Sequence, residues 1–249
     1  MTPEEMVSRV LYRDGLMLVI DKPAGMAVHR GPKGGESLED YFDALRYGLP
    51  RAPALAHRLD RDTSGCLVLG RHRKALAELG RLFKAGRVRK TYWAVVEGGP
   101  DADEGRIELA LGRLDPARGW WMKPDARGQP AVTTWRVLGR GGDASQRLTW
   151  LALEPLTGRT HQLRVHCAET GWPIVGDAIY GTAPRSGGPP LHLHAREVVV
   201  PLYKNRDPIR VIAPVPAFMW VRLKACGWEE TEAVIKAVAP TPAINTASP

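Results

Sequence analysis

The organisation of the chain is clearest at residues 55–70, which read LAHRLDRDTSGCLVLG. Apolar residues dominate both ends of this stretch, and the runs 55–59 and 66–70 have the length and composition of β-strands. Between them lie acidic and basic residues in alternation and a Thr-Ser-Gly sequence typical of a turn. If the chain is extended here, Arg58 and Asp60 share one face of the strand. We therefore expect two strands joined by a turn that exposes a carboxylate.

The acidic residues of this stretch are candidates for chemistry. Asp60 and Asp62 are each flanked by arginine, and a neighbouring cation keeps a carboxylate ionised, as a nucleophile or a base requires. A ladder of ion pairs on an edge strand explains the same pattern without any function. The residues alone leave both interpretations open.

Hydrophobic periodicity predicts the elements around this stretch. Residues 89–96 alternate, which places Lys90 and Tyr92 on one side of a strand. About ten strands with few helices between them favour an α+β fold, with a mainly antiparallel, mixed β-sheet and flanking helices, over a parallel doubly wound sheet. Further strands are predicted at 10–12, 16–20, 26–29, 105–112, 131–138, 148–154, 191–200 and 209–212, and helices at 37–47, 72–84, 160–170 and 217–226.

Length and composition fit one globular domain. At about 150 residues per domain, 249 residues allow one large domain or two small ones. We expect a single domain over residues 1–228 and a disordered tail over 229–249, which is rich in Ala, Thr and Pro. Three scattered cysteines and an acidic N-terminus without a signal sequence favour the cytoplasm. We expect a monomer without a membrane partner.

The positive charge of the chain is concentrated in one segment. The net charge is +8, and residues 51–90 hold eleven basic and three acidic residues, so that this segment alone accounts for the excess. So focused a charge favours a polyanionic partner, above all nucleic acid. A solvated basic helix face at 72–84 is the alternative.

Several common sites are missing or weak in the sequence. The glycines at 31–35 do not form a phosphate-binding loop, because no Gly-Lys-Ser/Thr follows. His192 and His194 lie on one predicted strand without a nearby carboxylate or cysteine, so a structural role is favoured over metal binding. Cys167 is expected to be buried and inert. We expect neither a metal nor another cofactor.

Five motifs, in order, resemble those of the RluA-type pseudouridine synthases. The central one is His57-Arg58-Leu59-Asp60 followed by Thr-Ser-Gly. The others are Lys-Pro-Ala-Gly at 22–25, Lys90-x-Tyr92, the stretch GRTHQLRVH at 158–166, and Pro-Ile-Val-Gly-Asp at 173–177. The resemblance extends from about residue 10 to 226 and implies the pseudouridine synthase fold. Because the first predicted strand begins near Val10, we expect the stand-alone catalytic form, without a separate small RNA-binding domain before it.

The resemblance implies a role for each matching residue. Asp60 is then the essential carboxylate, and Arg164 is the arginine that pairs with it. Tyr92 is the tyrosine that stacks on the target uracil and assists loss of the C5 proton. Arg58 takes the space of the flipped nucleotide in the RNA stack.

Three further residues of the same motifs, His57, Lys90 and His161, are expected to bind the substrate. The expected substrate is a stem-loop of tRNA, of 23S rRNA, or of both. Whether the aspartate attacks C1′, adds to the base or removes a C2′ proton stays open. Two alternatives are a non-catalytic RNA-binding or ribosome-assembly protein on the same scaffold and a metal-dependent nuclease, for which the acidic residues are too scattered.

Overall fold

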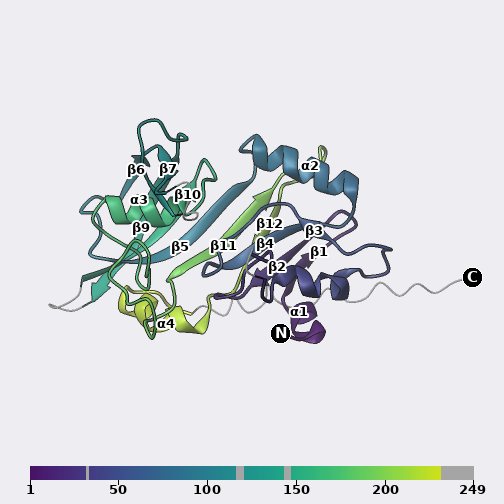
Figure 1. Cartoon of the computed structure of the whole chain (residues 1–249), viewed down its shortest axis with the longest axis horizontal. Coiled ribbons are helices and arrows are strands. Elements are labelled where there is room, and N and C mark those ends of the chain that lie inside the picture. The colour runs from purple at the N-terminus through teal and green to yellow at the C-terminus, as the bar shows by residue number, and fades with distance from the viewer. Residues whose placement is uncertain (32–33, 116–120, 143–146, 231–249) are drawn as a thin grey trace, which may run out of the picture.

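A computed structural model of the chain describes residues 1–31, 34–115, 121–142 and 147–230 (Figure 1). The helices are α1 (Pro3–Ser8), the 3₁₀ helix η1 (Leu38–Leu45), α2 (Arg73–Lys84), α3 (Gln162–Glu169) and α4 (Ala217–Ala225). The strands are β1 (Val10–Arg13), β2 (Met17–Lys22), β3 (Ala54–Leu55), β4 (Ser64–Gly70), β5 (Arg89–Glu97), β6 (Glu104–Glu108), β7 (Leu111–Arg113), β8 (Met122–Pro124), β9 (Val132–Gly142), β10 (Arg147–Pro155), β11 (Leu193–Val200) and β12 (Ile209–Ile212).

One ten-stranded sheet forms the centre of the molecule. Its order is β1-β2-β4-β11-β5-β10-β9-β6, with β12 beside β11 and β3 beside β4, while β7 and β8 form a separate hairpin. Among the strand pairs of the described residues, only β4 and β11 run parallel. The predicted α+β class with a mainly antiparallel, mixed sheet is therefore confirmed.

Alternation along the strands divides the core between the two faces of the sheet. On β5, Tyr92 and Ala94 face a cluster that includes Leu163 of α3, whereas Val95 faces the cluster under α4. Helix α2 packs on the same side as α4, through Leu79 and its neighbours against β2, β4 and β11. Tyr92 and Ala94 thus share one side of β5, as the alternation in the sequence predicted, and α3 covers that side.

The strand predicted over residues 55–59 is wrong beyond its first residue. Strand β3 ends at Leu55, and residues 56–63 form turns and irregular chain. The Val68 backbone N–H donates to Nε2 of His57 at 3.1 Å. Because a side chain occupies this N–H group of β4, the backbone that follows His57 leaves the sheet. The loop so released carries Asp60.

Other predicted boundaries also differ from the structure. The segment 26–29 forms only an isolated bridge at Ala27, and the helix predicted at 37–47 is η1. The single strand predicted over 105–112 is divided into β6 and β7. Helix α1 and strand β8 were not predicted.

A glycine allows β4 and β11 to approach closely beside this loop. Gly65 has φ +103°, and a Cβ there would lie 2.3 Å from the carbonyl oxygen of Ala195. Next to it, the Ser64 hydroxyl lies 2.9 Å from Nδ1 of His194. The Thr-Ser-Gly sequence after the acidic residues therefore anchors the end of the loop to β11.

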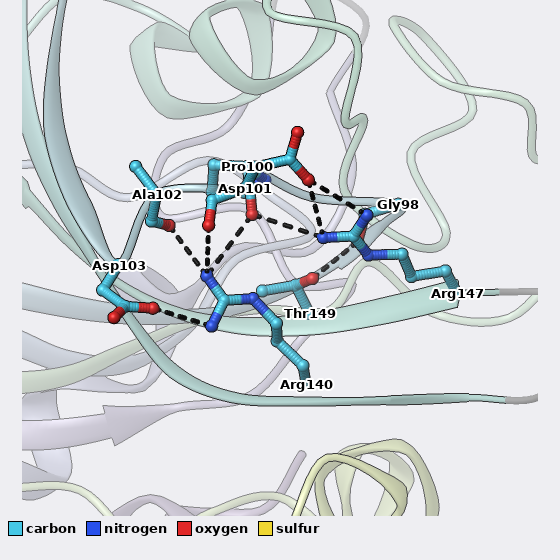
Figure 2. Close-up of polar contacts among 8 residues, drawn as sticks. All are labelled: Gly98, Pro100, Asp101, Ala102, Asp103, Arg140, Arg147 and Thr149. Carbon is cyan, nitrogen blue, oxygen red and sulfur yellow. Dashed lines mark hydrogen bonds and ion pairs between the residues drawn. The ribbon is translucent and has the colours of Figure 1, made fainter.

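Two arginines hold the connection between β5 and β6 against the β9–β10 hairpin (Figure 2). Arg140 of β9 donates to Asp103 Oδ1 at 2.7 Å and to the carbonyl of Asp101 at 3.1 Å. Arg147 of β10 lies 3.3 Å from the Asp101 carboxylate. These contacts are exposed, so they fix the path of the connection more than they add to stability.

The predicted domain boundary lies near the C-terminal end of the described residues. Residues 231–249 lie outside the described residues, so the single domain over 1–228 and the tail stay predictions. Among the residues that the structure describes, no helix is long and apolar enough to cross a membrane.

Candidate active site

Asp60 lies on the loop between β3 and β4, with its side chain 28% exposed. The turn that follows it is closed by a hydrogen bond from the Thr63 N–H to the Asp60 carbonyl at 3.2 Å. The side chains of Tyr92, His161 and Arg164 lie within electrostatic reach of the carboxylate, since its charge acts on the pKa of each of them. A partly exposed carboxylate therefore faces a largely buried set of polar groups.

A buried lysine supports the loop that carries Asp60. Lys22, at the end of β2, is completely buried. Its ammonium donates to the carbonyls of Pro23 at 2.8 Å, Met26 at 2.7 Å and Arg61 at 2.8 Å. Burial lowers the pKa of Lys22 to about 7, opposed by the charges of Asp62 and then Asp60. All three donors of an ammonium are thus used to join two loops.

Tyr92 lies on β5, within electrostatic reach of Asp60. Its side chain is buried on the α3 side of β5, opposite Leu153 of β10. Burial raises the pKa of the Tyr92 hydroxyl, and the charge of Asp60 adds to this effect. The phenol therefore stays neutral, with its hydroxyl near the carboxylate.

Arg164 is in the site, but the predicted pair with Asp60 is wrong. Its Nε and Nη2 donate to the two carboxylate oxygens of Asp177, at 2.8 and 2.6 Å. Asp177 also accepts the backbone N–H groups of Ile179 and Tyr180. Because Asp177 is itself completely buried and already oriented, it offers the planar guanidinium a better partner than a half-exposed loop.

The charge of Arg164 still reaches Asp60. Burial opposes the charged form of Arg164, but the hydrogen bonds and charge of Asp177, and then the charges of Asp60 and Asp62, raise its pKa. A permanent cation fixed by Asp177 therefore lies within electrostatic reach of Asp60.

His161 stands between Asp60 and Tyr180. Its Nε2 lies 3.9 Å from Asp60 Oδ1, and its side chain is 9% exposed. Its Nδ1 lies 2.8 Å from the Tyr180 hydroxyl. Burial lowers the pKa of His161, which the charge of Asp60 opposes.

The three other predicted substrate-binding residues differ in whether their side chains are free to bind a substrate. The Arg58 side chain is exposed and makes no hydrogen bond or ion pair with any residue that the structure describes. Lys90 has no carboxylate partner among the described residues, and burial lowers its pKa. The ring of His57 stacks on Phe83 at 4.5 Å between centroids and its Nε2 is occupied by Val68. Arg58 and Lys90 are thus free cations, while His57 packs against α2.

Sequence reasoning did not single out Lys22, Asp177 or Tyr180 as site residues. Lys22 ends a strand whose other residues at 17–20 are all apolar, which is itself a signal of a buried, partnered charge. Within the described ranges, no group of three or more His, Cys, Asp or Glu residues could hold a metal ion. The nuclease alternative therefore has no metal-binding cluster to support it there.

Comparisons with known proteins agree with the motifs. Residues 16–169 match the family described as RNA pseudouridylate synthase, and this range includes Asp60, Tyr92 and Arg164. A protein of Zymomonas mobilis described as an uncharacterized RNA pseudouridine synthase is 42% identical over 213 residues, 85% of this chain and 95% of that protein. The ribosomal large subunit pseudouridine synthase D of Borreliella burgdorferi is 33% identical over 82% of this chain and 64% of its own length.

A solved structure shows the same fold. The human protein described as RNA pseudouridylate synthase domain containing 4 superimposes with a TM-score of 0.75 and 26% identity, over 92% of this chain and 96% of that one. The resemblance read from the five motifs is thereby confirmed. The chain belongs to the RNA pseudouridylate synthase family, and it is an isomerase that converts uridine in RNA to pseudouridine.

Proposed function

We propose that this enzyme modifies a uridine in a stem-loop of ribosomal RNA, transfer RNA or both, that Asp60 is the catalytic carboxylate, and that no metal or cofactor takes part. The observation that carries the proposal is the place of Asp60, a partly exposed carboxylate beside buried Tyr92 and the fixed cation Arg164. The name of the Borreliella relative favours ribosomal RNA.

The chemistry needs only groups that this site holds. Isomerisation breaks the bond between N1 of uracil and C1′, joins C5 to C1′, releases the C5 proton and leaves N1 protonated. Asp60 acts as nucleophile or base at the nucleoside, and Tyr92 stacks on the uracil next to it. Arg164 keeps a positive charge beside the carboxylate without occupying it.

The free cations Arg58 and Lys90 bind the RNA. Arg58 is exposed next to Asp60, and it takes the place of the extruded nucleotide in the stack. Lys90, near the beginning of β5, contacts a phosphate near the target. His161 supports Asp60, and His57 supports the loop.

The test uses the purified protein with unmodified transcripts of 23S rRNA and tRNA that carry tritium at C5 of uridine. Release of tritium reports isomerisation, and mapping of pseudouridine identifies the position, with and without EDTA. We expect Asp60→Asn to lower turnover by about a thousandfold or more while RNA affinity stays within about twofold. Asp62→Asn is the matched control and should be mild. An active Asp60→Asn enzyme beside an inactive Asp62→Asn enzyme would overturn the assignment.

A further inference from the structure

His161 has a backbone conformation that its sequence does not explain. Its φ is +52°, in the left-handed region, which among the described non-glycine residues it shares only with Tyr47. It precedes α3 as the N-cap, yet its side chain makes no capping hydrogen bond. A left-handed non-glycine residue is retained when its surroundings demand it, and such residues gather at functional sites. Here the conformation directs the imidazole toward Asp60.

The hydrogen bonds of Tyr180 determine which nitrogen of His161 carries the proton. The Met122 N–H of β8 donates to the Tyr180 hydroxyl oxygen at 2.8 Å, and Nδ1 of His161 lies 2.8 Å from the same oxygen. All of these groups are satisfied when the hydroxyl donates to Nδ1. The remaining proton of the neutral imidazole then lies on Nε2, which faces Asp60.

The opposite arrangement leaves a group without a partner. If Nδ1 carried the proton, the Tyr180 oxygen would receive two N–H groups, and its own hydroxyl hydrogen would have no acceptor among the described residues. A protonated imidazole meets the same difficulty. The Tyr180 network therefore favours the neutral ring with its proton on Nε2.

The charges around His161 come from two sides. Asp60 and Asp62 lie on the loop before β4, Arg164 lies on α3, and Asp177 lies on the segment that carries Tyr180. Burial disfavours the imidazolium and Arg164 opposes it, whereas the three carboxylates favour it. Burial and Arg164 outweigh the carboxylates, so the pKa of His161 is lowered, and the hydrogen bond with Tyr180 acts in the same direction.

We infer that His161 is a positioning residue for Asp60, held by Tyr180 in the form that directs an N–H group at Oδ1 of the carboxylate. The inference rests on the proposed function of Asp60. The distance of 3.9 Å is longer than a hydrogen bond, and such contacts in a free enzyme tighten when substrate binds. The second oxygen of Asp60, which has no hydrogen bond to any described residue, is left for the nucleoside.

The first test reads the imidazole directly and needs no RNA. In ¹⁵N NMR spectra of the full chain at neutral pH, we expect His161 to be neutral with its proton on Nε2. Tyr180→Phe, which keeps the ring near Arg164, should mix the two tautomers and raise the pKa of His161. An Nδ1–H ring or an imidazolium in the wild-type protein would overturn the inference.

The second test follows turnover. At saturating RNA, Tyr180→Phe should lower kcat about tenfold with RNA affinity unchanged, and the acid limb of the kcat–pH profile should move to higher pH. His161→Gln, which keeps an N–H donor without titration, should retain more activity than His161→Ala, and combining it with Tyr180→Phe should abolish the pH shift. Tyr203→Phe, which breaks a 2.9 Å bond to Asp14 elsewhere in the molecule, is the matched control.

The outcomes separate the two proposals. An active Asp60→Asn enzyme refutes the proposed function. An inactive Asp60→Asn enzyme combined with wild-type kcat and pH profile in Tyr180→Phe refutes the positioning role alone.

Discussion

Arg164 acts on Asp60 without touching it. Its two hydrogen bonds go to Asp177, and both side chains are almost fully buried. Its guanidinium also lies 5.4 Å from the centroid of the Tyr180 ring. The pair therefore fixes a cation and the face of Tyr180 at the same time, so that a single substitution here affects stability and turnover together.

Arg164→Lys should be costly although it keeps the charge. Lysine cannot form the planar fork, so we expect the free energy of unfolding to fall by about 2 kcal/mol and kcat to fall about tenfold or more. Urea unfolding and tritium release measure the two effects. Arg210→Lys is the control, because Arg210 is exposed and its Nε and Nη2 both donate to Oε2 of Glu197, and its cost should stay below about 0.5 kcal/mol. Equal effects of the two substitutions would contradict a special role of the buried Arg164–Asp177 pair.

At the level of elements, the loops at 23–26 and 56–63 behave as one unit. Lys22 binds carbonyls in both loops, and the Arg61 side chain returns a hydrogen bond to the Gly25 carbonyl at 2.9 Å. The Lys-Pro-Ala-Gly motif is thus the support on which the Asp60 loop rests. A loop outside the sheet is ordered here by buried polar contacts rather than by strand pairing.

Lys22→Met tests this support. The apolar side chain fills the space but leaves three carbonyls without donors, so we expect a loss of about 2 kcal/mol in the free energy of unfolding. Hydrogen exchange should become faster over residues 56–63, and kcat should fall about tenfold. Lys74→Met, at an exposed position of α2, is the control. Unchanged exchange in this loop would show that Lys22 does not hold it.

Helix α2 carries the exposed part of the basic segment. Its apolar residues Ala75, Leu79 and Leu82 are buried as the periodicity predicted, and Arg73, Lys74 and Lys84 are exposed. Arg81, however, is paired with Glu78 at 2.6 and 3.0 Å. The helix packs on the face of the sheet opposite Tyr92, so its cations are suited to phosphates beyond the target nucleotide.

Single alanine substitutions at Arg73, Lys74 and Lys84 should weaken RNA binding. Removing one cation that binds a phosphate should reduce the slope of log K against log salt by up to about 0.9. Arg81→Ala should change the slope less, because Glu78 already neutralises that charge. Turnover at saturating RNA should stay near wild type throughout. A combined variant with the wild-type slope would show that α2 faces away from the RNA.

For the whole molecule, buried histidines link stability to pH. Burial lowers the pKa of His57 and His194 to about 3 and that of His192 to about 4. In the unfolded chain these groups titrate near pH 6.5, so below that value the unfolded state binds more protons. Stability is therefore lost as pH falls from about 6.5 toward 4. Asp21 offsets the contribution of one of the three histidines, because burial raises its pKa to about 6 and the folded state then holds a proton that the unfolded state releases.

The three histidines gain protons on unfolding and Asp21 loses one, so these four groups give a net uptake of two protons. They should lower the free energy of unfolding by about 2.7 kcal/mol per pH unit between about pH 5.5 and 4.5, and His161 and His166, whose pKa values burial also lowers, make the fall steeper. Urea unfolding at a series of pH values measures the slope, and His194→Asn should reduce it by about 1.4 kcal/mol per pH unit, the contribution of one proton. His29→Gln, at an exposed histidine, should leave it unchanged. Constant stability from pH 7 to 5 would contradict the burial of these rings.

Features that depend on local periodicity and on the order of the motifs could be predicted from the chain alone. The alternation at 89–96 placed Tyr92 and Ala94 on one side of β5 and Val95 on the other, and the apolar spacing at 72–84 defined α2. Five motifs in order identified the family, including the segment around Asp60. Side-chain alternation on a strand and the turn of a helix repeat over a few residues, so they can be read from the chain without knowing its fold.

Which polar groups meet depends on the folded arrangement of the whole chain. Lys22 and Arg61 are 39 residues apart, and Arg164 and Asp177 are 13 apart, so neither contact follows from local spacing. The loop at 56–63 leaves the sheet because one N–H of β4 is taken by a side chain, an outcome that strand propensity does not contain. The proton on His161 likewise depends on Tyr180, whose hydroxyl lies beside Nδ1 of His161 and accepts the N–H of Met122 from another segment. Buried polar groups bind whichever partner the packing brings to them, and that packing is a property of the whole chain.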